Sequence, residues 1–386
     1  MLLSIGLILF LTSISLPGFH YVRCLNSQSL LKPPENELFS PSLTIFLPVR
    51  NESTLICSKI DELLRMELDF SKTSILIVDS CSTDDTKEIA ENHLSKVEPP
   101  LNWHVTEIPT PGKSYAVNYA LENIDSEFMI MVDADAILPS NSLKKILRWF
   151  TDPTIGAVCG KLDTSRNILN NQYRRRFNSI RLGESAIDST PIFEGSICGF
   201  RTDAIGKSRI NPRVNADDTQ LSIIVRRNGF KAIMDSSVIF KEARFGIGAG
   251  SSSRRSTRRA QGISRVLWLN RDILSFPDAS YRRIFQNQFY FYLLFPWLLL
   301  ASITMIVSSM IWWMSLENVN PSLIAITVFS ITMAASYFRI SRELIGGAYY
   351  LVKSHILLFL RIRLNSWIPD EDRRKKTLQM IAESTD

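Results

Sequence analysis

The fold class of this chain is decided by the stretch Phe128-Met129-Ile130-Met131-Val132-Asp133-Ala134-Asp135, an apolar run of strand length that ends in two carboxylates. Residues i and i+2 of an extended backbone point the same way, so we expect Asp133 and Asp135 to face one point beyond the strand. Open α/β sheets bind ligands there, outside the carboxyl ends of their strands. Two oxygen ligands suit Mg²⁺ or Mn²⁺ bridging to phosphates, whereas the simpler alternative is a solvated acidic turn.

Apolar runs of strand length and helical segments alternate on both sides of this stretch. The predicted strands cover residues 43–49, 74–78, 103–108, 128–132, 155–161 and 232–240. The predicted helices cover residues 53–66, 112–123, 140–150 and a segment that is capped within 82–84 and runs towards His93. Alternation at this spacing predicts an α/β fold with a doubly wound, largely parallel sheet.

Three long apolar runs lie near the ends of the chain, at residues 1–16, 289–314 and 323–337. The two later runs are near or above the length that crosses a bilayer, and both have aromatic ends. The first run could be a signal peptide, but it lacks a basic n-region and a clear cleavage site, which favours a retained anchor. Basic residues flank these runs and predict that the long segment between the anchors is cytoplasmic.

These features predict a multi-pass protein of the cell membrane with five segments. They are an N-terminal transmembrane anchor (1–23), a linker (24–40), an α/β domain (41–272), two transmembrane helices (273–340), and an interfacial helix with a basic cytoplasmic tail (341–386).

The charge distribution indicates which classes of partner to expect, and the cysteine content indicates the redox compartment of the protein. The net charge of +6 is modest and gathers near the membrane flanks and in residues 254–271, which favours lipid headgroups and anionic phosphates. No nucleic-acid module is recognised, so we expect no nucleic-acid partner. The five cysteines are odd in number and lack metal-ligand spacing, as is typical of a reduced, cytosolic domain.

Polar residues follow several predicted strands at the point where each strand ends. They are Arg50-Asn51-Glu52, then Asp79, and then Asp133 with Asp135. Periodicity predicts the strands but does not demand acids at these positions. Their coincidence on one edge of a sheet predicts a nucleotide pocket.

The order and spacing of four motifs resemble a family 2 glycosyltransferase across about residues 43–270. The motifs lie at 48–52, 78–86, 112–118 and 133–135. The resemblance implies a GT-A-type fold with a mixed, doubly wound sheet, a nucleotide-diphosphate-sugar donor and inversion at the anomeric carbon. Within this family, the chain is similar to polysaccharide synthases and lipid-linked sugar transferases.

By this resemblance, the nucleotide-sugar pocket is formed by residues from several strand ends. Asp79 would contact the base or ribose, Pro48 and Glu52 would line the same pocket, and Lys113 would lie near the pyrophosphate. Many members of the family have a second acid after Asp79, where this chain has Ser80, so the choice of base stays open.

The resemblance also assigns the metal and the catalytic base. Asp133, which also counts as donor-binding, and Asp135 would be the DxD pair that holds Mg²⁺ or Mn²⁺, with Asp135 the more direct ligand. Asp217 and Asp218 match the family's acidic pair, with Asp218 as the general base that takes the proton of the acceptor hydroxyl. The alternative is that an acidic pair in the first turn only stabilises a helix N-terminus.

Residues 194–201 match the family's acceptor-proximal loop, which would place Glu194, Gly195 and Ser196 beside the acceptor. Glycine there would let the backbone approach the acceptor closely. An ordinary turn before a strand is the alternative for this segment.

An arginine-rich segment precedes the later apolar runs, and its donor-binding candidates are Arg258, Arg259, Gln261 and Arg265. Its glycine–serine lead-in favours a loop that closes over the diphosphate, whereas the alternative is a solvated or membrane-facing surface. Processive polysaccharide synthases of the family carry Gln-x-x-Arg-Trp here. This chain has those residue types, in Gln261-Gly262-Ile263-Ser264-Arg265-Val266-Leu267-Trp268, without that spacing.

The sequence therefore predicts a membrane-bound glycosyltransferase whose acceptor is lipid-linked or a glycan. One alternative is a processive synthase of the cellulose or hyaluronan synthase type. A second is a catalytically degenerate membrane scaffold, which the retained acids Asp79, Asp133, Asp135 and Asp218 argue against.

Overall fold

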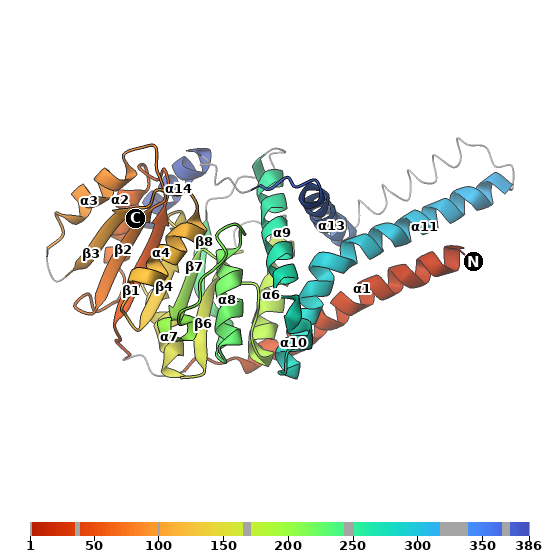
Figure 1. Cartoon of the computed structure of the whole chain (residues 1–386), viewed down its shortest axis with the longest axis horizontal. Coiled ribbons are helices and arrows are strands. Elements are labelled where there is room, and N and C mark those ends of the chain that lie inside the picture. The colour runs from red at the N-terminus through yellow and green to blue at the C-terminus, as the bar shows by residue number, and fades with distance from the viewer. Residues whose placement is uncertain are drawn as a thin grey trace. The chain divides into compact units, whose positions relative to one another are not determined.

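The structure is a computed structural model and describes residues 2–34, 39–98, 101–164, 171–242, 251–316, 339–364 and 371–385 (Figure 1). The chain divides into two compact units. The sheet unit contains residues 24–248 and 365–386, and the helical unit contains residues 1–23 and 249–364.

The sheet unit is built on one eight-stranded sheet with the order β3-β2-β1-β4-β7-β6-β8-β5. Neighbours among β1 to β4 pair in parallel, whereas β7 runs antiparallel to both β4 and β6, so the sheet is mixed. The strands are β1 (Leu43–Val49), β2 (Thr73–Asp79), β3 (Asn102–Glu107), β4 (Phe128–Val132), β5 (Ala136–Ile137), β6 (Ile155–Leu162), β7 (Ile197–Arg201) and β8 (Lys231–Glu242). The mixed α/β sheet is confirmed, although β5 and β7 were not among the predicted strands.

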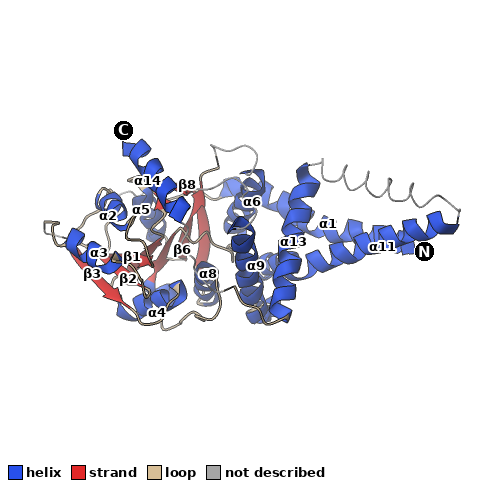
Figure 2. Cartoon of the chain, turned by 90° about the horizontal axis from the view of Figure 1, so that it is seen from above, coloured by secondary structure: helices blue, strands red, loops and turns tan. Residues whose placement is uncertain are grey.

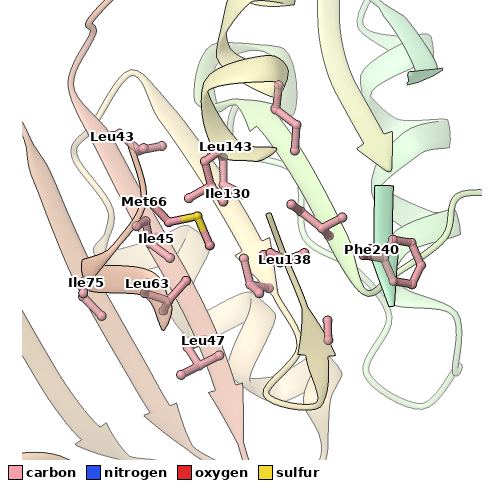
Figure 3. Packing of buried hydrophobic residues seen from close by; sticks show 14 of the residues in the cluster. Leu43, Ile45, Leu47, Leu63, Met66, Ile75, Ile130, Leu138, Leu143 and Phe240 are labelled. Carbon is pink, nitrogen blue, oxygen red and sulfur yellow. The ribbon is translucent and has the colours of Figure 1, made fainter. Parts of the chain in front are cut away.

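Helices cover both faces of this sheet, because alternate residues of its buried strands point to opposite sides. Ile45 and Leu47 of β1 lie in one cluster with residues of α2, α3 and α5, of which Leu63 and Leu143 are shown in Figure 3. Phe46 packs with α4, α7 and α8 on the other face. The helices of this unit are α2 (Ile56–Leu64), α3 (Thr86–Leu94), α4 (Lys113–Asn123), α5 (Ser142–Leu147), α6 (Asn171–Ile187), α7 (Thr202–Ile205), α8 (Asp217–Arg227) and α14 (Glu371–Thr385). Short 3-10 helices lie at Gln28–Leu30 and Arg148–Thr151.

The stretch Asp133–Asp135 forms a turn, which corrects the expectation of an extended backbone there. β4 ends at Val132, and the amide of Ala136 donates to the carbonyl of Asp133 at 3.2 Å. The chain turns because Ala136 begins β5, which pairs antiparallel with β8. The two aspartates therefore lie at the carboxyl end of the strand, as predicted, but their common direction does not follow from strand alternation.

The helical unit contains the two apolar helical stretches that are candidate membrane spans, Leu2–Leu30 and Ala279–Trp313, with only the last residues of the first stretch in the sheet unit. Both are long and apolar enough to cross a membrane. The first runs beside the second (Figures 1 and 2), and the Tyr290 hydroxyl donates to the carbonyl of Ser13 at 3.2 Å. The helices are α1 (Leu2–Ser27), α9 (Ser251–Leu269), α10 (Ala279–Phe289), α11 (Phe295–Leu316) and α13 (Arg339–Phe359), with a 3-10 helix at Arg271–Ser275 and a π-helix at Tyr290–Leu294. The predicted span at 323–337 lies outside the described residues.

The compact units end at different residues from the predicted segments. Helix α1 continues through Ser27 into the predicted linker. The sheet unit stops at Gly248, short of the predicted boundary at 272, because the basic helix α9 packs against α13 and α10. The C-terminal segment from Asn365, which contains the predicted basic tail, belongs to the sheet unit.

Candidate active site

A partly buried lysine, whose side chain is 19% exposed, joins the acidic groups that follow β4 and open α8. The Nζ atom of Lys113, the first residue of α4, lies 2.6 Å from Asp133 Oδ1 and 3.4 Å from Asp217 Oδ2. The same atom donates to the carbonyl of Gly195 at 3.4 Å. Three segments that are far apart in the sequence therefore meet at one ammonium group.

Electrostatics keep this lysine charged. Burial by itself would lower the pKa of Lys113, but Asp133, followed by Asp217 and Asp218, more than offsets this effect and raises the pKa above its ordinary value. Lys113 thus balances a cluster of carboxylates that would otherwise repel an anionic ligand.

The acidic pair Asp217-Asp218 lies in the first turn of α8, as the structural alternative requires, but it is also part of the lysine cluster. Ala216 precedes the helix in the left-handed conformation, with φ 72°, which is uncommon for alanine. The Oδ1 atom of Asp218 accepts from the amide of Thr219 at 2.8 Å. The helix dipole favours both carboxylates at this position.

Gly195 leaves room for the Asp218 carboxylate. A Cβ atom at residue 195 would lie 2.8 Å from Asp218 Oδ2, closer than carbon and oxygen approach without a shift. The adjacent Ser196 accepts from the amide of Asp133 through its carbonyl at 3.0 Å. The segment predicted to be acceptor-proximal therefore contacts both the predicted base and the predicted metal ligand.

Glu194 differs from its two neighbours, because its side chain points into the protein. It is 4% exposed and ion-pairs with Arg181 of α6, while Arg174 lies 3.7 Å from it. The hydroxyl of Ser196 donates to Glu242 at 2.5 Å. A turn before β7 is thus also correct, and a contact of Glu194 with an acceptor stays a prediction.

Asp79 ends β2 as a buried carboxylate with one oxygen that lacks a hydrogen bond. It is 1% exposed, and its Oδ1 accepts from the amide of Ser82 at 2.8 Å. Its Oδ2 has no hydrogen-bond partner among the described residues. Burial raises the pKa of Asp79, although the bonds from Ser82 lower it in part. Such an oxygen can accept a hydrogen bond from a hydroxyl or an N–H group of a ligand.

The loops after β1 and β2 are tied together around this carboxylate. The amide of Asn51, which has φ 54°, donates to Ser82 Oγ at 2.8 Å. The amide of Glu52 donates to Thr86 Oγ1 at 2.8 Å, and Pro48 is paired with Val78 in the sheet. The residues predicted to line the nucleotide pocket therefore do lie at adjacent strand ends.

The comparison with known proteins identifies the family. A sequence profile described as Glycosyl transferase family 2 matches residues 44–209, and one described as Glycosyl transferase family group 2 matches residues 128–340. The second match covers more than half of the 386 residues. The chain belongs to glycosyltransferase family 2.

Two bacterial relatives of this family 2 glycosyltransferase match parts of its sequence. The poly(ribitol-phosphate) beta-N-acetylglucosaminyltransferase TarS of Staphylococcus aureus is 30% identical over 105 residues, which cover 26% of this chain and 17% of TarS. The beta-monoglucosyldiacylglycerol synthase of Synechocystis is 28% identical over 119 residues, which cover 31% of this chain and 25% of the synthase. The chain thus spans a quarter or less of the length of these relatives.

A solved structure shares the fold over nearly the whole chain. The mannosyltransferase PcManGT from Pyrobaculum calidifontis, in complex with GDP-Man and Mn²⁺, has a TM-score of 0.79 and 24% sequence identity. The match covers 94% of this chain and 99% of that one. The GT-A-type fold expected for a family 2 glycosyltransferase is confirmed.

The acidic turn of this glycosyltransferase fits a cation that arrives with a phosphate ligand. Among the described residues, no group of three or more His, Cys, Asp or Glu side chains could hold a metal ion. Asp133 and Asp135 supply two carboxylates, and Mg²⁺ is commonly bound by one or two carboxylates together with substrate phosphates. These two carboxylates suit a metal site completed by substrate phosphates better than a site formed by protein ligands alone.

The four donor-binding candidates of the basic segment lie on α9, in the helical unit. Gln261 is 2% exposed and its amide group is engaged there, because Nε2 donates to the carbonyl of Ile362 at 3.1 Å and Oε1 accepts from the amide of Leu364 at 3.0 Å. Gln261 therefore holds the chain after α13. Donor contacts of Arg258, Arg259, Gln261 and Arg265 stay predictions.

The prediction from the sequence did not include two residues that lie near the site. Lys59 of α2 is 1% exposed, and its Nζ donates to the carbonyl of Ala136 and to Glu62 Oε1, both at 2.6 Å. It therefore fixes the residue directly after Asp135. Arg374 of α14 ion-pairs with Glu52 at 2.9 Å. No sequence pattern predicts these contacts. A lysine in an amphipathic helix and an arginine in a basic segment both indicate a side chain that is exposed to solvent.

Replacing Gly195 by alanine is expected to displace the Asp218 carboxylate. We expect Gly195→Ala to lower sugar transfer by about 100-fold, since small misplacements of reacting groups have effects of that size. Gly18→Ala is a control, because a Cβ there meets nothing within 4 Å. Transfer rates and thermal unfolding of both variants test this. A Gly195→Ala enzyme with wild-type turnover would show that Asp218 needs no such space.

Replacing Asp79 by asparagine is expected to weaken donor binding while stabilising the fold. The pKa of Asp79 is raised by burial, so its ionised form destabilises the folded state at neutral pH. We expect Asp79→Asn to raise Tm by about 3 °C at pH 7 and to weaken nucleoside diphosphate binding about tenfold. The stability gain should fade as pH falls through the raised pKa towards the ordinary value of 3.8. Calorimetry across pH measures this, and a lower Tm at pH 7 would contradict it.

Proposed function

We propose that this chain is a membrane-bound glycosyltransferase that moves a sugar, with inversion, from a nucleotide-diphosphate-sugar to a lipid-linked or glycan acceptor. Family membership gives a nucleotide-sugar glycosyltransferase. The observation that carries the finer proposal is the position of Lys113. It contacts Asp133, on the predicted donor side, and Asp217, which is adjacent to the predicted base.

Asp218 is proposed to act as the general base. Its carboxylate takes the proton of the acceptor hydroxyl while that oxygen forms a bond to the anomeric carbon, and the bond from this carbon to the diphosphate breaks. A single displacement from the opposite side inverts the anomeric centre. The ammonium group of Lys113 offsets the charge of the nearby carboxylates, so that the cluster does not exclude the anionic donor.

Asp79 and the tied loops after β1 and β2 are proposed to bind the nucleoside. The partnerless Oδ2 of Asp79 is an acceptor for a hydroxyl or an N–H group of the nucleotide. Asp133 and Asp135 would hold Mg²⁺ or Mn²⁺ on the diphosphate. When bound, this cation neutralises the charge that develops on the departing phosphate.

We base the proposal that the acceptor lies at the membrane on the two candidate spans. Large apolar side chains are exposed along the helical unit, for example Phe19, at 74%, and Trp312, at 68%. Such surfaces are stable in contact with lipid. A multi-pass protein with its active site in the cytoplasm would meet acceptors at the bilayer surface. The relative from Synechocystis is named as the synthase of a diacylglycerol glycolipid.

The test is a donor and acceptor screen with the full-length protein in lipid nanodiscs. GDP-mannose with Mn²⁺ is the first pair to try, followed by a panel of UDP- and GDP-sugars, with polyprenyl phosphate and diacylglycerol as acceptors. We expect one donor to give a lipid product heavier by one sugar. A ladder of products would favour the processive alternative, and no product or nucleoside diphosphate from any pair would favour the scaffold alternative.

A further inference from the structure

The C-terminal helix α14 contributes a largely shielded arginine to the sheet unit. Arg374 lies in the basic run Arg373-Arg374-Lys375-Lys376, which by charge alone indicates a solvated or membrane-facing surface. Its side chain is nevertheless only 12% exposed. Thr377, which lies one helical turn after Arg374, is fully buried. Helix α14 is therefore seated on the sheet unit and is not a free tail.

The guanidinium group of Arg374 binds two groups of the loop after β1. Its Nε lies 2.9 Å from Glu52 Oε2, and its Nη2 donates to the carbonyl of Arg50 at 3.4 Å. The Glu52 side chain is 9% exposed, so the pair is mostly shielded from water. A planar guanidinium can hold two acceptors in a fixed geometry, which an ammonium group cannot do.

This loop is the one that leads to the proposed nucleotide pocket. The amide of Glu52 donates to Thr86 Oγ1, and the residue before it, Asn51, is tied to Ser82. Ser82 in turn donates through its amide to Asp79, the carboxylate with a partnerless oxygen. The backbone of residues 50–52 and these hydrogen bonds therefore connect Arg374 to the residue proposed to bind the nucleoside.

We propose that Arg374 is a positioning residue of the nucleotide pocket, through which α14 holds the loop after β1 in its nucleotide-receiving form. This inference rests on the proposed function. Removing the guanidinium breaks this ion pair with the buried Glu52 carboxylate, which is costly in a shielded site. Coupling between two sites is reciprocal, so nucleotide binding also strengthens the docking of α14.

The test compares nucleoside diphosphate binding by the full-length protein and two variants. Binding of GDP and UDP with Mn²⁺ is measured by calorimetry, together with kcat and KM for the donor. We expect Arg374→Gln to weaken binding about tenfold while kcat stays within about twofold of wild type, since Asp218 belongs to the cluster around Lys113. Lys375→Gln removes the same charge from an exposed neighbour on α14 and should bind as wild type.

Three outcomes overturn the inference. One is wild-type affinity in Arg374→Gln, and another is an equal loss in Lys375→Gln, which would indicate a general attraction by charge. In both cases the wild-type protein binds and the proposed function survives. A wild-type protein that binds no nucleoside diphosphate would overturn the proposed function as well.

A second measurement covers the case in which Arg374→Gln does not fold. Amide hydrogen exchange of the wild-type protein is followed with and without GDP or UDP. We expect the nucleotide that binds to slow exchange both in the loop at 50–56 and in α14, by about tenfold or more in the latter. Slowed exchange in the loop with unchanged exchange in α14 would contradict the coupling.

Discussion

Asp218→Asn is expected to lower sugar transfer by about 1,000-fold while leaving nucleoside diphosphate binding within about twofold of wild type. Asparagine keeps the shape of the side chain, and its carbonyl oxygen can still accept the hydrogen bond from the amide of Thr219. It cannot take a proton from the acceptor hydroxyl. The loss should therefore fall on kcat, because donor binding does not require the base.

The matched control for this variant is Asp203→Asn. Asp203 also lies in the first turn of a helix, α7, but it is exposed and outside the lysine cluster. Its replacement should leave transfer unchanged. Thermal unfolding of both variants separates catalysis from stability. Turnover of Asp218→Asn within about tenfold of wild type would reject Asp218 as the general base.

Asp135→Ala is expected to abolish metal-dependent transfer, with a loss of at least about 100-fold at saturating Mn²⁺. The substitution removes one of the two carboxylates of the turn after β4. Lys113 holds Asp133 at 2.6 Å, so Asp133 alone is a poor replacement as the metal ligand. We also expect the concentration of Mn²⁺ needed for half-maximal activity to rise by about tenfold or more.

Asp125→Ala provides the control at the opposite end of the same strand. Asp125 precedes β4 and is exposed, so its loss removes an equal charge without touching the turn. Titrations of activity with Mn²⁺ and Mg²⁺ compare the three proteins. If Asp135→Ala keeps the wild-type metal dependence, the acidic turn is a solvated surface feature, which was the alternative for this stretch.

Local patterns were sufficient to predict most strands of the sheet and the polar residues at their ends, but not β5 and β7. The buried strands around Phe128–Val132 are continuous apolar runs, and this pattern does not depend on distant residues. Asp79 and Asp133 were placed at one edge because parallel strands end on the same side, and the register Val49 with Asp79 agrees with that.

Contacts between distant segments could not be predicted from such patterns. The turn at Asp133–Asp135 forms because Ala136 pairs with Glu242 of β8, a partner that no local signal indicates. The ion pair of Lys113 with Asp217 and that of Arg374 with Glu52 likewise depend on tertiary folding. In both ion pairs, a charged residue that indicates a solvated surface in the sequence becomes largely shielded from water beside a partner from another element.

The most direct test of the central claim is the coupled measurement of nucleoside diphosphate release and sugar transfer. Wild-type protein, Asp218→Asn and Asp135→Ala are compared in lipid nanodiscs with Mn²⁺ and the donor selected by the screen. We expect the wild-type protein to release one nucleoside diphosphate for each sugar added to the acceptor, and both variants to lose the two signals together. Transfer that persists in both variants would contradict a reaction centred on Lys113 and its surrounding carboxylates.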